Sequence, residues 1–175
     1  MSALPCLGPN DEPPPLAQPG NPTGNPLGTA AERAMLQAEA HVHVARATTM
    51  LRRARALVAA DRAHRIALLT RQRERLFADL AHFQRFKHTR IFDPVVRHGS
   101  ASAKVVARTM KVDCFHLGET VASYHARWRY LDRAEWASYR ADMLATADLL
   151  HARMQAELRA IDQLLTISHF YAPRA

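Results

Sequence analysis

The fold class is decided by residues 136–165, which read WASYRADMLATADLLHARMQAELRAIDQLL. Apolar side chains recur in this stretch every three or four residues, which is the spacing of one face of an α-helix. The stripe consists of Trp136, Tyr139, Met143, Ala147, Leu150, Met154, Leu158, Ile161 and Leu165. Asp132 and Glu135, just before it, form a helix start signal. The pattern predicts one long amphipathic helix with a single buried face.

A second stripe of the same period lies in the preceding segment, residues 102–131. Its members are separated alternately by four and three residues, and they are Met110, Cys114, Leu117, Val121, Tyr124, Trp128 and Leu131. This spacing places them on one face of a helix, and we expect that whole face to be buried. Gly118, inside the predicted helix, indicates a close approach of a neighbouring helix or a bend.

The chain upstream contains neither glycine nor proline from Thr29 to Asp93, a run of 65 residues. Thr29 and Glu32 form a capping-box pattern, so we expect a helix to begin there. As one helix the run would span about 100 Å, which is improbable in a small domain. One apolar stripe ends near Val58 and another resumes at Ile66. The prediction is an antiparallel hairpin that bends near residues 60–65, with a long coiled coil as the alternative.

Residues 94–102 carry proline, glycine and serine and are predicted to form the one clear loop. The sequence therefore predicts an all-α protein, an up-down-up-down four-helix bundle. We expect a disordered leader at residues 1–28, the bundle at 29–168 and a C-terminal tail at 169–175. The leader holds eight of the ten prolines and four of the six glycines, and has too few large side chains for a core.

The composition of the chain narrows the class of protein. No apolar run approaches the roughly 18 to 20 residues of a membrane-spanning helix, and no secretory signal is evident at the N-terminus. Two cysteines, Cys6 and Cys114, do not make a disulfide framework. We therefore expect a soluble, cytoplasmic protein with no membrane partner. The net charge of +8 is compatible with an anionic partner, and equally with an arginine-rich composition that has no functional meaning.

Ten histidines are the first functional lead, because facing helices of a bundle can bring side chains together on a metal ion. Helical spacing places three of them at or beside the apolar stripes. These three are His43, His88 and His151. All three could point inward, although the spacing does not place them at one height of the bundle.

The segment Phe83-Gln-Arg-Phe-Lys-His88-Thr-Arg-Ile-Phe-Asp-Pro94 resembles the H-x-x-x-E-x-x-lfP corner of the hemerythrin-like, or HHE cation-binding, four-helix bundles. His151, with Glu157 six residues later, is similar to the last-helix ligands of that family. The resemblance implies a di-iron centre that binds oxygen or senses iron. It would assign the metal to His43, His88, Asp93, His151 and Glu157.

The chain departs from that family at two places. Phe92 stands where the family has its glutamate, and the third predicted helix has apolar residues where the family has a histidine pair. A di-iron site needs bridging carboxylates and about five histidines. We therefore expect a hemerythrin-like bundle without an intact di-iron site and without a cofactor, and keep iron or oxygen binding as the alternative.

Arginines gather around the predicted hairpin turn, opposed there only by Asp61 and Glu74. They are Arg52, Arg53, Arg55, Arg62, Arg65, Arg71, Arg73 and Arg75. Such a cluster could contact phosphates, but no aromatic residues are interleaved with it and no nucleic-acid-binding motif is present. Solvated helix faces are the preferred interpretation, and a nucleic-acid-associated protein is the second alternative.

Other candidate groups have structural explanations. Ser100 and Ser102 are expected to cap the next helix, although free amides at that point could also hold an anion. Cys114 and His116 point about 200° apart on a helix, so they do not form a catalytic dyad. With no catalytic constellation, the predicted function is a non-enzymatic binding or regulatory module with a protein partner or self-association.

Overall fold

The computed structural model describes residues 24–166 of the chain. The earlier part of the predicted leader and the predicted tail at 169–175 lie outside them. Four long helices make up most of this part of the chain. In order, the helical elements are α1 (Ala30–Ala59), the 3₁₀ turn η1 (Ala63–Arg65), α2 (Ile66–Phe86), the π-helical turn η2 (Lys87–Phe92), α3 (Asp93–His98), α4 (Ala101–Arg127) and α5 (Trp136–Thr166). Short helical segments join α1 to α2 and α2 to α4, and turns at residues 128–135 join α4 to α5.

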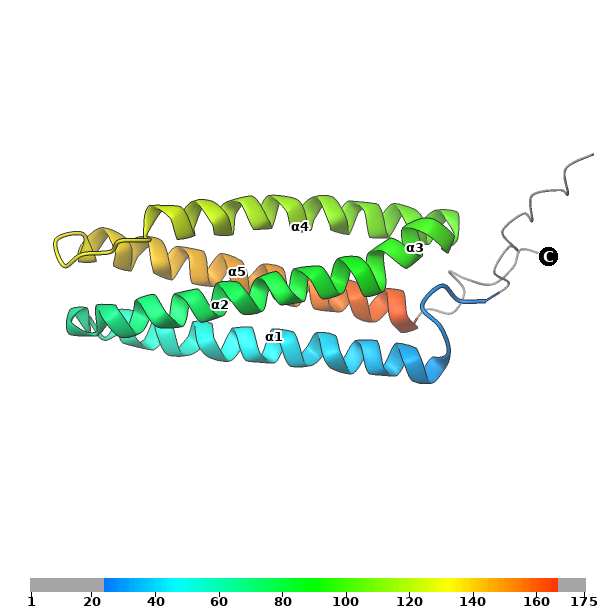
Figure 1. Ribbon diagram of the computed structural model, residues 1–175, viewed down its shortest axis with the longest axis horizontal. Helices are drawn as coiled ribbons and strands as arrows, with labels where there is room; N and C mark the ends of the chain where they lie inside the picture. The colour runs from blue at the N-terminus through cyan, green and yellow to red at the C-terminus, as the bar shows by residue number, and fades with distance from the viewer. Residues whose placement is uncertain (1–23, 167–175) are drawn as a thin grey trace, which may run out of the picture.

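The long helices run alternately in opposite directions, so the predicted up-down-up-down bundle is confirmed (Figure 1). The α1/α2 and α4/α5 connections lie at one end, and the α3/α4 connection lies at the other. α1 packs along α5 and α2, whereas α4 meets the rest of the bundle mainly through α3 and η2. The described part of the chain contains no strand and no helix long and apolar enough to cross a membrane.

The first helix begins at the predicted capping box. The Thr29 amide donates to Glu32 Oε2 at 2.7 Å, and the Glu32 amide donates to Thr29 Oγ1 at 3.2 Å. The Thr29 hydroxyl also donates to Glu32 Oε2, at 2.9 Å, and the two bonds that this carboxylate accepts from Thr29 lower the pKa of Glu32, because they favour the carboxylate over the acid. Leu27, which lies just before this cap in the stretch assigned to the leader, is buried in the core. The ordered packing therefore starts a few residues before the helix.

The predicted hairpin bend near residues 60–65 is also confirmed. The Asp61 amide bonds to the Val58 carbonyl and the Arg62 amide bonds to the Leu57 carbonyl, both at 3.1 Å, which together make a Schellman motif. Asp61 takes the left-handed conformation at φ 54° that glycine usually supplies, and aspartate is one of the few other residues that tolerates it. The bend therefore forms without a glycine or proline to mark it.

The prediction of a loop at residues 94–102 is wrong for most of these residues. After α2 the backbone continues helically through η2 into α3, and only Gly99 and Ser100 separate α3 from α4. Pro94 lies in the first turn of α3, where a missing amide hydrogen is tolerated. A Cβ on Gly99 would lie 2.6 Å from the Val95 carbonyl oxygen, so only glycine fits this tight exit.

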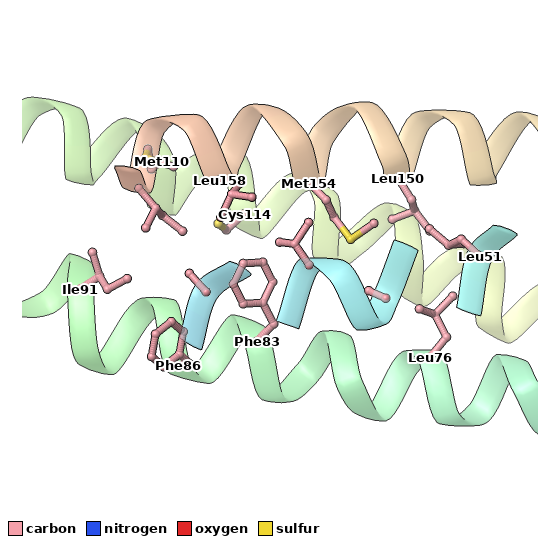
Figure 2. Close-up of a cluster of buried hydrophobic side chains, with 14 of the residues drawn as sticks. Leu51, Leu76, Phe83, Phe86, Ile91, Met110, Cys114, Leu150, Met154 and Leu158 are labelled. Carbon is pink, nitrogen blue, oxygen red and sulfur yellow. The ribbon is translucent and has the colours of Figure 1, made fainter. Parts of the chain in front are cut away.

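Ser100 caps α4 as predicted, and its Oγ accepts from the Ala103 amide at 3.2 Å. α4 ends at Arg127, four residues before the expected boundary, and Trp128 follows it as a buried side chain. All nine members of the α5 stripe are buried. Figure 2 shows side chains from α2, α4 and α5, among them Phe83, Cys114 and Met154, gathered in the shared interior.

The α4 face is buried only in part, which corrects our expectation for the whole stripe. Met110, Cys114 and Trp128 are buried, but Leu117, Val121, Tyr124 and Leu131 are half-buried. The physical reason is that α4 packs against α3 and η2 at one end and makes few contacts with α2 along its middle. This middle section borders a cleft.

Candidate ligand-binding site

The cleft lies between α2 and α4, has α5 as its floor, and has a volume of about 230 Å³. Its apolar surface comes from Phe77, Leu80, Phe83, Leu117, Val121, Leu150 and Met154. The lining also includes residues with exposed or small side chains, where α2 and α4 face each other. These are Ala81, Gln84, Gly118 and Ala122. A Cβ on Gly118 would meet only the Gln84 side chain, at 3.8 Å, so little fills the space at this point.

Three polar side chains lie together in the lining of the cleft: Lys87 of η2, Cys114 of α4 and Glu157 of α5. Lys87 Nζ donates to Glu157 Oε2 and, at 3.2 Å, to Cys114 Sγ. The Cys114 thiol donates to Glu157 Oε1 at 3.1 Å. Each of the three helical segments thus contributes one member to a single hydrogen-bonded cluster.

The Lys87–Glu157 pair is buried, with side-chain exposures of 5% and 9%. Burying two charges is costly, and the cost is offset only where their mutual attraction and further hydrogen bonds are good. Lys87 gains an additional contact, because its Nζ lies 4.5 Å from the centre of the Phe83 ring. The cluster is electrically balanced and still presents polar atoms to a mostly apolar cleft, whose lining also includes Gln84 and His125.

Burial of Cys114, opposed in part by the nearby Lys87 charge, raises the pKa of the thiol to about 12. The thiol is therefore protonated at neutral pH and acts as a hydrogen-bond donor to Glu157. A protonated thiol is a poor nucleophile, and this position does not suit covalent catalysis. The predicted core role of Cys114 is confirmed by its burial.

A second, smaller cavity of about 30 Å³ adjoins the cleft and shares Phe77, Val121 and Leu150 with it. Arg73 of α2 lines this cavity together with Tyr124 and Tyr139. Burial raises the pKa of both tyrosines, so both hydroxyl groups stay protonated, and they hydrogen-bond to each other. Arg73 is 5% exposed, so a basic residue faces the interior at this level of the bundle.

Two of the predicted metal ligands lie next to aromatic rings. The half-buried His43 packs against Phe83 and Phe86, with both pairs of ring centres 5.5 Å apart. His88 packs edge-on to Phe92, and its buried Nε2 has no hydrogen-bond partner among the described residues. Burial, followed by the Lys111 and Lys87 charges, lowers the pKa of His88. Both imidazole rings therefore pack against phenylalanine side chains.

The other predicted ligands are placed elsewhere. Asp93 accepts from Lys111 Nζ at 2.6 Å, and Glu157 belongs to the cluster with Lys87. His151 is exposed and lines a surface groove between α1 and α5. The prediction that its side chain points into the bundle is therefore wrong. Residues 24–166 contain no group of three or more His, Cys, Asp or Glu side chains that could hold a metal ion. The residues present do not fit a di-iron centre.

The eight arginines of the predicted cluster do not all lie on the surface of the bundle. Seven of its eight members are exposed around the α1/α2 hairpin, as the interpretation of solvated helix faces requires. The exception is Arg73, which is buried. Arg73 lies four residues after Leu69 and three before Leu76, and Lys87 lies four residues after Phe83, so both occupy positions of the apolar stripe of α2. A basic residue at a stripe position was the signal that sequence reasoning missed.

Comparisons of the chain with known protein families, with curated proteins and with solved structures give no match.

Proposed function

We propose that this bundle is a small-molecule-binding module, which takes one compact and mostly apolar molecule into the cleft between α2 and α4. The apolar walls bury the body of the molecule. The cluster of Lys87, Cys114 and Glu157 offers it one polar contact. The sequence predicts a non-enzymatic binding or regulatory module with a protein partner or self-association; the proposal keeps the binding role and replaces that partner by a small molecule.

One observation carries the proposal: an apolar cleft of about 230 Å³ whose lining includes a buried, hydrogen-bonded ion pair. Ligand sites are mostly apolar concavities with a few convergent polar groups. An engineered apolar cavity of roughly 150 Å³ binds benzene, so the cleft has room for a somewhat larger body such as a substituted aromatic ring. Because α2, α4 and α5 all line the cleft, a bound molecule would bridge helices that otherwise make few contacts there.

We do not propose an iron site. The candidate ligands His43, Asp93 and His151 each have different surroundings: His43 packs on Phe83, Asp93 pairs with Lys111, and His151 is exposed. We also propose that the protein is cytoplasmic. The two cysteines of the chain, with the buried Cys114 as a free thiol, suit a reducing compartment.

A neutral dye that fluoresces in apolar surroundings, N-phenyl-1-naphthylamine, tests the site. We expect saturable binding at one site per chain, and displacement by small aromatic compounds. Ala122→Leu places a larger side chain at the lining between α2 and α4 and should abolish the signal. Ala126→Leu, one turn later on an exposed face of α4, is the matched control and should bind like the wild type.

Circular dichroism of both variants confirms that the bundle is intact. Dye binding that does not saturate, or that survives Ala122→Leu unchanged, contradicts a ligand site in the cleft.

A second candidate function, contact with nucleic acid, is favoured by the seven exposed arginines around the α1/α2 hairpin. Phosphate contacts predict an affinity for double-stranded DNA or RNA that falls steeply with salt. Binding that is absent at low salt, or that does not change with salt, rejects this candidate.

A further inference from the structure

Arg73 is a buried basic side chain whose ion pair, with the exposed Glu74, is long. Its Nε and Nη1 atoms are buried and have no hydrogen-bond partner among the described residues. Nη2 makes one long bond, 3.4 Å, to the carbonyl of Arg129. A guanidinium always carries its charge, and burying it without good partners is strongly unfavourable.

The ion pair of Arg73 with Glu74 compensates the buried charge only weakly, because it is long and its carboxylate is exposed to solvent. Glu74 has a carboxylate oxygen 3.8 Å from Arg73 Nε, but the Glu74 side chain is half exposed. Both of its oxygens also contact His125 Nε2, at 2.9 and 3.0 Å. The contrast with Lys87 is clear, since Lys87 has its own buried carboxylate in Glu157. Lys87 thus has a close buried partner, whereas Arg73 has only the long ion pair with Glu74 and faces a cavity.

The cavity that Arg73 lines adjoins the cleft. The two spaces share Phe77, Val121 and Leu150 in their linings, so the cavity of the guanidinium is a direct neighbour of the cleft. The smaller cavity, of about 30 Å³, has room for at least one water molecule, whose place an oxygen atom of a carboxylate could take. A molecule whose body lies in the cleft could therefore reach Arg73 with a small terminal group. Gln72, whose buried Oε1 also lacks a partner among the described residues, lines the same cavity.

We propose that the ligand of the cleft is an amphipathic anion, with an apolar body between α2 and α4 and a carboxylate or similar anionic group on Arg73. This inference rests on the proposed function. It adds that the ligand is negatively charged and that its charged end lies at Arg73. The anionic end points to Arg73 because the other buried cation, Lys87, is already neutralised by Glu157. A charged hydrogen bond in a desolvated site is stronger than a neutral one and gives orientation.

The test compares two molecules of nearly the same size and shape, the anionic 3-phenylpropanoate and the neutral 3-phenylpropanamide. Isothermal titration at neutral pH should show the carboxylate binding at least about tenfold more tightly than the amide, as the strength of a charged hydrogen bond implies. The preference should persist at about 1 M salt, where the Debye length is about 3 Å and attraction by the surface arginines is screened.

Arg73→Met keeps most of the side-chain volume and removes the charge, so it should bring the two affinities together while amide binding remains. Arg71→Met, which removes an exposed arginine two residues away, should leave the preference unchanged. Arg73→Met should also fold with a melting temperature at least equal to that of the wild type, because a buried charge with only long contacts to its partners is unfavourable in the free protein.

Each outcome has a distinct meaning. Equal binding of carboxylate and amide by the wild-type chain overturns the anion proposal and leaves the cleft as a binding site; this comparison needs no variant. A preference that persists in Arg73→Met, or that disappears at high salt, also overturns it. Binding of neither molecule, together with no dye binding, rejects the proposed function itself.

Discussion

The indole Nε1 of Trp136 donates a hydrogen bond of 2.6 Å to Oδ1 of Asp61, which ties the first residue of α5 to the turn between α1 and α2. Asp61 has two roles there. Its backbone adopts the left-handed conformation of the hairpin, and its carboxylate satisfies a largely buried indole. The contact holds together two segments that are 75 residues apart in the chain.

Asp61→Ala should lower the free energy of unfolding by about 1 to 3 kcal/mol, because the indole N–H loses its acceptor. Asp61→Asn keeps an acceptor and tolerates the left-handed conformation, so it should lose much less. Urea denaturation measures both. If the alanine and asparagine variants were equally stable, the hydrogen bond to Trp136 would not be the reason for an aspartate at this position.

The buried Lys87–Glu157 pair predicts a non-additive pair of substitutions. Lys87→Met alone should cost about 3 to 5 kcal/mol of unfolding free energy, because Glu157 is left as an unpaired buried charge. The double variant Lys87→Met, Glu157→Leu should recover most of that loss, since two apolar side chains can replace a buried pair.

The exposed pair Arg55–Asp148 is the control for that cycle, and Arg55→Met should cost less than about 1 kcal/mol. A double variant as unstable as Lys87→Met would show that the two residues do not compensate each other.

The Cys114 thiol should resist alkylation in the folded protein. With its pKa raised to about 12 by burial, almost none of it is thiolate at pH 8, and thiolate is the reactive form. In a Cys6→Ser background, where Cys114 is the only thiol, iodoacetamide should react at least about a hundredfold more slowly with folded than with urea-unfolded protein. Mass spectrometry gives both rates. Equal rates would show that the thiol is accessible and ionised.

Trp128 should contribute strongly to stability although it lies just beyond α4. It is 2% exposed, and its Nε1 donates to Asp142 Oδ2 at 2.6 Å. Trp128→Ala should cost about 3 to 5 kcal/mol, chiefly through the cavity it leaves. Trp128→Phe retains most of the packing and should cost about 1.5 to 3 kcal/mol for the hydrogen bond to a carboxylate. A loss under 1 kcal/mol for the alanine variant, measured by urea denaturation, contradicts its place in the core.

The candidate site was only partly predictable from the sequence. Glu157 was identified as a residue of interest and Cys114 as a core residue, and both belong to the cleft. Arg73 was assigned to an exposed arginine cluster and Lys87 was not singled out, although both occupy stripe positions of α2. The period of a helix says which residues share a face. It does not say whether a basic residue on that face finds a partner or turns to solvent.

What the sequence determined by itself is the set of four amphipathic helices and the caps at Thr29 and Ser100, because helical period and capping are properties of neighbouring residues. Tertiary structure decided three further features. Asp61 forms a turn stabilised by Trp136, the chain continues helically through Pro94 where a loop was predicted, and α4 stands away from α2 to leave a cleft. The bond between Asp61 and Trp136 and the separation of α4 from α2 depend on segments far apart in the chain, and the energy of such contacts has no local signature in the amino-acid pattern.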